Sequence, residues 1–246
     1  MRLFPSHDRG VRSTSKATAF AQAQSVGSEL MQVAMQDVLV TDQTGSLAWK
    51  QPHIMAALAA GIRLGTAVGE PLTHKFINAS GVGHAVDRDT GMEDGDFNPA
   101  LDAEDAIESG VLFTEEASGG NRIVVDNTTY GIDQSFVFNR GSVVEAAQFV
   151  AKTLRETAEL VFVGQKVSNG AAQSIKSVLR NKLRELNAPE VNIITSSADA
   201  PEGFVEETFV VEVQGNTASV QVEVKPVQGL DFVFITFTLG DISQSA

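Results

Sequence analysis

The chain has 246 residues, of which 43% are hydrophobic and 20% are charged, a composition typical of a folded protein with one large or two small domains. It contains no cysteine, which excludes disulfides, thiolate nucleophiles and cysteine-bound zinc. The formal net charge of −13 argues against a broad nucleic-acid-binding surface and against binding to anionic membranes, because both require a basic surface.

Acidic and basic residues are unevenly distributed along the chain. Residues 84–140 contain 3 basic and 13 acidic residues, and residues 189–246 contain 1 and 9. Between them, residues 141–188 contain 7 basic and 4 acidic residues. A basic segment between two acidic ones can place a positive face opposite a negative partner.

The first eighty residues predict two helices and two strands after a polar N-terminal segment. Residues 1–20 are rich in Ser, Thr and Arg, which is typical of an extended arm or a poorly ordered end. A short helix is predicted over 28–35 and a short strand over 37–41. A proline in the first turn opens a longer predicted helix over 52–64, and another strand is predicted over 72–77.

The middle of the chain predicts a loop, one helix and two strands. Residues 83–100 are rich in glycine and acidic residues, which indicates a loop. A short helix is predicted over 102–109, with Asp102 as its N-cap. Two strands are predicted over 111–114 and 122–126, joined by a glycine-containing turn.

The last hundred residues predict two amphipathic helices followed by strands. Apolar residues at helical spacing indicate one helix with Ser142 as its N-cap and a second over 170–186. Alternating residues in 209–213 and 220–224, with a Gly-Asn turn between them, indicate a β-hairpin. Residues 232–239 are apolar on both faces, so this strand must be covered on both sides by its own fold or by a neighbour.

The sequence contains no recognisable catalytic motif. G-x-S-x-G, H-E-x-x-H and G-x-x-x-x-G-K-[ST] are all missing, so we predict no catalytic residue, no metal and no cofactor. The acidic stretch Asp87–Asp96 resembles the start of a calcium loop. However, Met92 stands where an EF-hand requires Gly, and Asn98 stands where it requires Glu. The four histidines lack metal-ligand spacing; they are His7, His53, His74 and His84.

The second predicted amphipathic helix carries a basic stripe beside its apolar face. At 100° per residue, Lys176, Arg180 and Arg184 fall on one continuous strip of the helix surface. Such a stripe is commonly a solvated face, but the acidic remainder of the chain makes it a candidate binding surface.

Seven short segments, in their order and spacing, resemble one known family. They lie within residues 50–240 and are 54–62, 72–75, 110–112, 126–130, 160–165, 168–170 and 174–186. Together they resemble contractile phage tail sheath proteins, in the C-terminal part of the sheath with its conserved inner domain.

The resemblance implies a mixed α/β fold in three parts. Residues 1–20 would be an N-terminal arm or disordered, and residues 21–135 part of an α/β middle domain. Residues 136–246 would be the inner C-terminal domain, with two helices and a β-hairpin or sheet. Sheath proteins are usually longer, so the chain is expected to be a fragment, a split gene product or a reduced sheath.

The resemblance also implies a structural, non-enzymatic function. The chain would polymerise into stacked hexameric rings around a tail tube and contract to drive the tube through the target cell envelope. Its partners would be further copies of itself, the tail tube protein and, as an open alternative, a second sheath chain, but neither nucleic acid nor a membrane. It would lie in the phage virion after assembly in the host cytoplasm.

In this family, arms of neighbouring subunits add strands to each other's sheets, and an inner helix contacts the tube. Lys176, Arg180 and Arg184 are therefore the expected tube contacts. The expected inter-subunit strand residues are Phe209, Val211, Val213, Val220, Val222, Val224, Phe232, Phe234 and Thr236. Two alternatives stay open: another self-assembling tail or baseplate component and, less favoured, a hydrolase that uses the carboxylates of residues 87–108.

Overall fold

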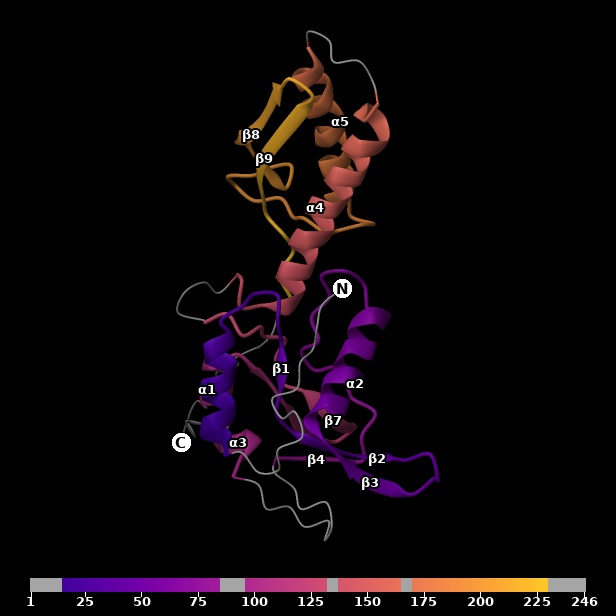
Figure 1. Ribbon diagram of the computed structural model, residues 1–246, viewed down its shortest axis with the longest axis vertical. Coiled ribbons are helices and arrows are strands. Elements are labelled where there is room, and N and C mark those ends of the chain that lie inside the picture. The colour runs from indigo at the N-terminus through magenta and orange to yellow at the C-terminus, as the bar shows by residue number, and fades with distance from the viewer. Residues whose placement is uncertain (1–14, 85–95, 132–136, 165–169, 230–246) are drawn as a thin grey trace, which may run out of the picture.

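The computed structural model describes residues 15–84, 96–131, 137–164 and 170–229. These residues form two lobes along the long axis of the molecule, and the helix α4 (Gly141–Phe162) runs from one lobe into the other (Figure 1). Helices and strands occur in both lobes, which confirms the predicted mixed α/β class. The predicted domain boundary near residue 135 stays a prediction.

The larger lobe contains the first ten elements of the chain. These are α1 (Lys16–Val26), β1 (Val33–Ala34), β2 (Asp37–Thr41), β3 (Leu47–Lys50), α2 (Pro52–Gly65), β4 (Gly81–Gly83), α3 (Pro99–Glu108), β5 (Val111–Leu112), β6 (Thr114–Ala117) and β7 (Gly120–Ile123). β1 pairs with β5 in parallel, β3, β2 and β4 form an antiparallel sheet, and β6 and β7 form a hairpin.

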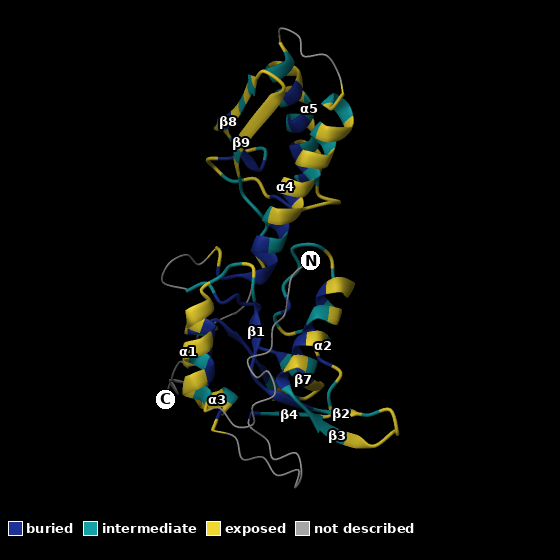
Figure 2. Cartoon of the chain, viewed as in Figure 1, coloured by how far each residue is buried: buried dark blue, intermediate teal, exposed yellow. Residues whose placement is uncertain are grey.

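The core of the larger lobe lies between these short strands and the three helices. On one side, Ala19 and Ala23 of α1 are fully buried near Phe113, whose ring meets that of Phe97 edge to face at 5.4 Å. On the other side, α2 buries Met55 and its neighbours against β2. The buried residues follow the inner faces of the helices, and the exposed residues the outer faces (Figure 2).

The smaller lobe contains most of α4, α5 (Ala171–Leu186), β8 (Phe204–Gln214) and β9 (Thr217–Val224). The apolar faces of both helices and the inner face of the β8–β9 hairpin form one hydrophobic cluster. Its buried members are Ala146, Val150, Leu154, Ile175, Leu179, Leu183, Leu186, Ile193, Ile194, Phe204 and Phe209. The two predicted amphipathic helices and the predicted hairpin are therefore confirmed.

Two elements predicted in the first eighty residues are wrong. Residues 28–35 form no helix, because Val33 and Ala34 are held instead as β1 by the parallel pairing with β5. Residues 72–77 form turns with one isolated bridge, from Phe76 to Arg122, and His74 has a positive φ of 62° that is incompatible with a continuous strand.

Three predicted N-terminal boundaries are also corrected. The predicted arm is wrong for residues 16–20, because Ser15 caps α1 by accepting the N–H of Thr18, while residues 1–14 lie outside the described residues. α3 begins at Pro99 after the cap residue Asn98, not after Asp102. Ser142 is not the N-cap of α4, because the helix begins at Gly141 after the cap residue Arg140. The N–H of Ser142, inside the first turn, donates to the Asp126 carboxylate.

Gly110 is a position where the fold requires glycine. Its φ is +74°, and a Cβ there would lie 2.5 Å from the Thr128 carbonyl oxygen. We expect Gly110→Ala to lower the free energy of unfolding by about 3 kcal/mol. Alanine is strained in the left-handed conformation, and its Cβ would also force backbone atoms to move. Gly45→Ala is the matched control, with φ +84° and no atom within 4 Å, and should cost about 1 kcal/mol in denaturant titration. Equal losses would contradict this reading.

Candidate functional site

The basic stripe lies on α5 as predicted, but each of its residues has an acidic partner within the chain. Lys176 and Arg180 both form ion pairs with Glu206 of β8, and Lys176 Nζ lies 3.1 Å from Glu206 Oε1. Arg184 forms a two-point pair with Glu202, at 2.8 and 3.0 Å. Three cations and two carboxylates leave a single net positive charge on this surface.

The ion pairs on α5 are partly exposed, and pairing shifts the pKa values of Glu206 and Arg184. Burial opposes ionisation of Glu206, but hydrogen bonds from Arg180 and Lys176 hold its pKa below the ordinary value. The hydrogen bond to Glu202 raises the pKa of Arg184. The Lys176 ammonium also lies 5.0 Å from the centroid of the Phe209 ring, a cation–π distance. Surface pairs of this kind contribute about 0–1 kcal/mol each, so their partners can be exchanged at little cost.

The stripe is evident from helical spacing in the sequence, but its acidic partners are not. Glu202 and Glu206 come from the segment around the start of β8, and only the folding of β8 onto α5 brings them to the helix. The acidic excess of residues 189–246 was the one available signal.

The predicted inter-subunit residues of the hairpin face the core of the smaller lobe. Phe209 is 1% exposed, in edge-to-face contact with Phe204, and Val220 is 39% exposed. The other four are partly buried against the same cluster; they are Val211, Val213, Val222 and Val224. Phe232, Phe234 and Thr236 lie outside the described residues.

The exposed feature of the hairpin is the backbone edge of β9. Within the described part of the chain, β9 pairs with β8 alone. The register places Gln214 opposite Thr217 across a two-residue loop, which makes Thr217, Ser219 and Gln221 the residues that bond to β8. The N–H and C=O groups of the residues between them therefore point to the other edge, where a further strand could pair; these are Ala218, Val220 and Val222.

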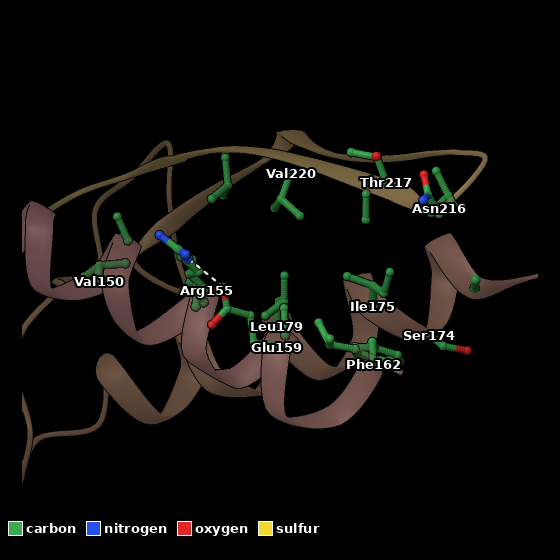
Figure 3. Close-up of a pocket in the computed structure, with 18 of the residues that line it drawn as sticks. Val150, Arg155, Glu159, Phe162, Ser174, Ile175, Leu179, Asn216, Thr217 and Val220 are labelled. Atoms are coloured by element: carbon green, nitrogen blue, oxygen red, sulfur yellow. Dashed lines mark hydrogen bonds and ion pairs between the residues drawn. The ribbon is translucent and has the colours of Figure 1, made fainter. Parts of the chain in front are cut away.

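An apolar groove of about 960 Å³ runs beside this edge, between α4 and β9 (Figure 3). Val150 and Phe162 of α4, Ile175 and Leu179 of α5, and Val220 of β9 lie around it. Small residues of α4 widen it; these are Ala147, Ala151 and Ala158. An unpaired strand edge beside an apolar groove suits an extended peptide, whose backbone pairs with the edge while alternate side chains enter the groove.

Residues 87–108 supply the carboxylates of the hydrolase alternative, and in the described part of this region Asp102 has a structural role. Asp102 accepts the N–H of Asn98 and forms a 2.8 Å ion pair with Lys16, and these hydrogen bonds lower its pKa. No group of three or more His, Asp or Glu side chains in the described ranges could hold a metal ion. Most of the Asp87–Asp96 stretch lies outside those ranges. No helix in the ranges the structure describes is long and apolar enough to cross a membrane.

Comparisons with known proteins relate the chain to proteins of contractile tails. No family model matches it. It is 28% identical over 188 residues to a protein of Enterococcus phage phiEF24C that is provisionally named a tail sheath protein, covering 74% of this chain and 29% of the relative.

Solved structures share the fold at low sequence identity. A sheath tail protein of Desulfitobacterium hafniense has a TM-score of 0.59 and 15% identity, over 82% of this chain and 43% of that chain. The contracted sheath complex of the extracellular contractile injection system PVC gives 0.63 and 12%, over 97% and 64%. The baseplate structure of the anti-feeding prophage gives 0.63 and 13%, over 98% and 60%. The chain therefore spans less than a third of its phage relative and between 43% and 64% of these three structures.

Proposed function

Since both its sequence and its fold match contractile tail sheath proteins, we propose that this chain is a structural, non-enzymatic component of a contractile sheath that assembles with further copies of itself. The observation that carries the proposal is the β9 edge beside the apolar groove. It offers an apolar surface together with backbone groups that pair with no other strand among the described residues, as a strand-accepting interface requires.

The strand that this edge accepts would be residues 232–239 of a second copy. In an extended strand, Phe232, Phe234 and Thr236 would lie on one face, because successive residues of a strand point to opposite sides. These side chains would enter the groove, while the backbone pairs with Ala218 and Val220. This arrangement would explain why residues 232–239 are apolar on both faces, because one face would meet the groove and the other a further neighbour.

Repetition of this contact would link subunits into rings and stack the rings helically around a tail tube. Strand addition is suited to a machine that contracts, since backbone hydrogen bonds hold the linked strand while the bodies of the subunits move. The resemblance to the sheath family supports our proposal that these rings would be hexameric and would contract to drive the tube through the target envelope.

The tube contact would be made by Lys176, Arg180 and Arg184, through exchange of partners between Glu202 and Glu206 and acidic groups of the tube. Replacing the three cations with Gln should weaken tube attachment about tenfold or more at low salt, with a smaller effect at high salt because of screening. Co-sedimentation with the tube protein measures this.

The matched control removes three cations that lie outside this stripe. Replacing Lys50, Lys152 and Lys182 with Gln gives the same change in net charge. Equal weakening by both triple variants would show that the stripe has no specific role.

Electron microscopy of the purified protein at high concentration tests the proposed function itself. We expect rings or tubes with helical symmetry. Closed assemblies without helical symmetry would favour another tail or baseplate component, and a protein that stays monomeric at every concentration and does not bind a tube protein would overturn the proposal.

A further inference from the structure

A buried ion pair lies at the junction of the two lobes. Arg63 in the last turn of α2 pairs with Asp126, and the two side chains are only 4% and 0% exposed. The Asp126 carboxylate also accepts the Ser142 N–H at 2.8 Å and the Gln32 side-chain amide at 2.7 Å, and its carbonyl oxygen accepts the N–H of Gly141. Asp126 thus fixes the first turn of α4 to the larger lobe.

Arg63 reaches from the same place to α4 itself. Its Nη1 donates to Glu145 of α4 at 3.2 Å and to the carbonyl oxygen of Glu70 at 2.7 Å. One guanidinium therefore connects α2, Asp126, α4 and the loop that follows α2. We call Arg63, Asp126 and Glu145 the joint cluster.

The loop after α2 provides a second connection between the lobes. Val68 packs against the hydrophobic cluster of the smaller lobe, and a Cβ on Gly69 would touch the Ala146 side chain at 3.4 Å. Pro71 lies so close to Gly229, in the segment after β9, that a Cβ at 229 would be 2.5 Å from its ring. Arg63 holds this loop through the Glu70 carbonyl, so it acts on both connections.

We infer that Arg63 is a positioning residue that fixes the orientation of the smaller lobe, and with it of the β9 edge, relative to the larger lobe. Buried ion pairs contribute little net stability, since desolvation offsets the attraction, but their directional hydrogen bonds can select one geometry. The geometry of the joint cluster suits that role, because it connects the larger lobe to the N-terminal turns of α4. Among the described residues, α4 is the only helix that extends into both lobes. The inference does not depend on sheath assembly.

Spin-label distances test the inference cleanly, because the chain has no cysteine of its own. Labels at Leu101→Cys on α3 and Ser219→Cys on β9 report the distance between the lobes, and both positions are exposed. Double electron–electron resonance on the monomeric protein measures the distribution of distances between the two labels. With the joint cluster unmodified, we expect one narrow distribution. Arg63→Met/Asp126→Asn, which removes both charges and keeps an oxygen at 126, should widen it at least twofold.

Two further variants keep the outcome interpretable. Lys152→Met/Glu156→Gln removes an exposed ion pair from the same helix, and should leave the distribution unchanged. Glu145→Gln changes a partner that is 25% exposed, so it should fold even where the double variant does not, and should widen the distribution by a smaller amount. Folded Arg63 or Glu145 variants with the original narrow distribution would overturn the inference, whether or not the protein forms a sheath.

Discussion

Val220→Pro should abolish self-assembly at concentrations where the unmodified chain forms rings or tubes. The substitution removes an N–H that points to the free edge of β9, and its ring obstructs an incoming strand, while the ladder to β8 keeps its bonds. A loss of about 3 kcal/mol per contact corresponds to a rise of about 100-fold in the concentration required for assembly. Analytical sedimentation over a concentration series measures that shift.

Val220→Thr is the matched control for this prediction. It keeps the backbone N–H and the branched shape of the side chain, so assembly should persist with a moderate loss from the added hydroxyl in the groove. If Val220→Pro is folded by circular dichroism and still assembles like the unmodified chain, the β9 edge does not accept a strand.

Phe232→Asp/Phe234→Asp should have an effect at least as large, from the donor side of the same contact. Both residues fall on the strand face assigned to the apolar groove, and an ionised carboxylate without a partner there costs several kcal/mol. We expect no assembly at attainable concentrations by electron microscopy or sedimentation. The monomer should unfold like the unmodified monomer, because residues 230–246 would be donated to a neighbour.

Ser243→Asp/Ser245→Asp adds the same charge to the same segment and should assemble normally. Loss of assembly in both double variants would indicate a general effect of charge, and normal assembly of the phenylalanine variant would remove residues 232–239 from the interface.

The smaller lobe was predictable from the sequence because its patterns are local. The 3.6-residue spacing from Val143 to Val161 and from Ala172 to Leu186 gives each helix one apolar face, and those faces meet in the structure. Alternation on both sides of Gly215-Asn216 sets the hairpin register, since a two-residue loop allows few alternatives. Three of the seven segments that resemble sheath proteins lie in or beside these two helices.

The larger lobe was less predictable because long-range contacts decide its elements. Val33 joins a strand only through Val111, 78 residues away, and local propensity alone favoured a helix there. The start of α4 is set by Asp126 rather than by Ser142, which no pattern near residue 142 could reveal. Tertiary pairing overrode local signals in both cases.

The candidate site likewise has one feature that local sequence patterns predict and others that depend on long-range contacts. The basic stripe on α5 follows from helical periodicity, but its neutralisation by Glu202 and Glu206 depends on how β8 folds onto the helix. The groove is lined by α4, α5 and the β8–β9 hairpin, which meet only in the folded lobe. The joint cluster is equally non-local, since Arg63 and Asp126 are 63 residues apart.

Hydrogen exchange of the β9 amides tests strand addition most directly. The amides of Ala218, Val220 and Val222 should exchange freely in dilute monomer and become protected by at least 100-fold in the assembled protein, while those of Ser219 and Gln221 should be protected in both states by their bonds to β8. Equal exchange of Ala218, Val220 and Val222 in monomer and assembly would contradict assembly through the β9 edge.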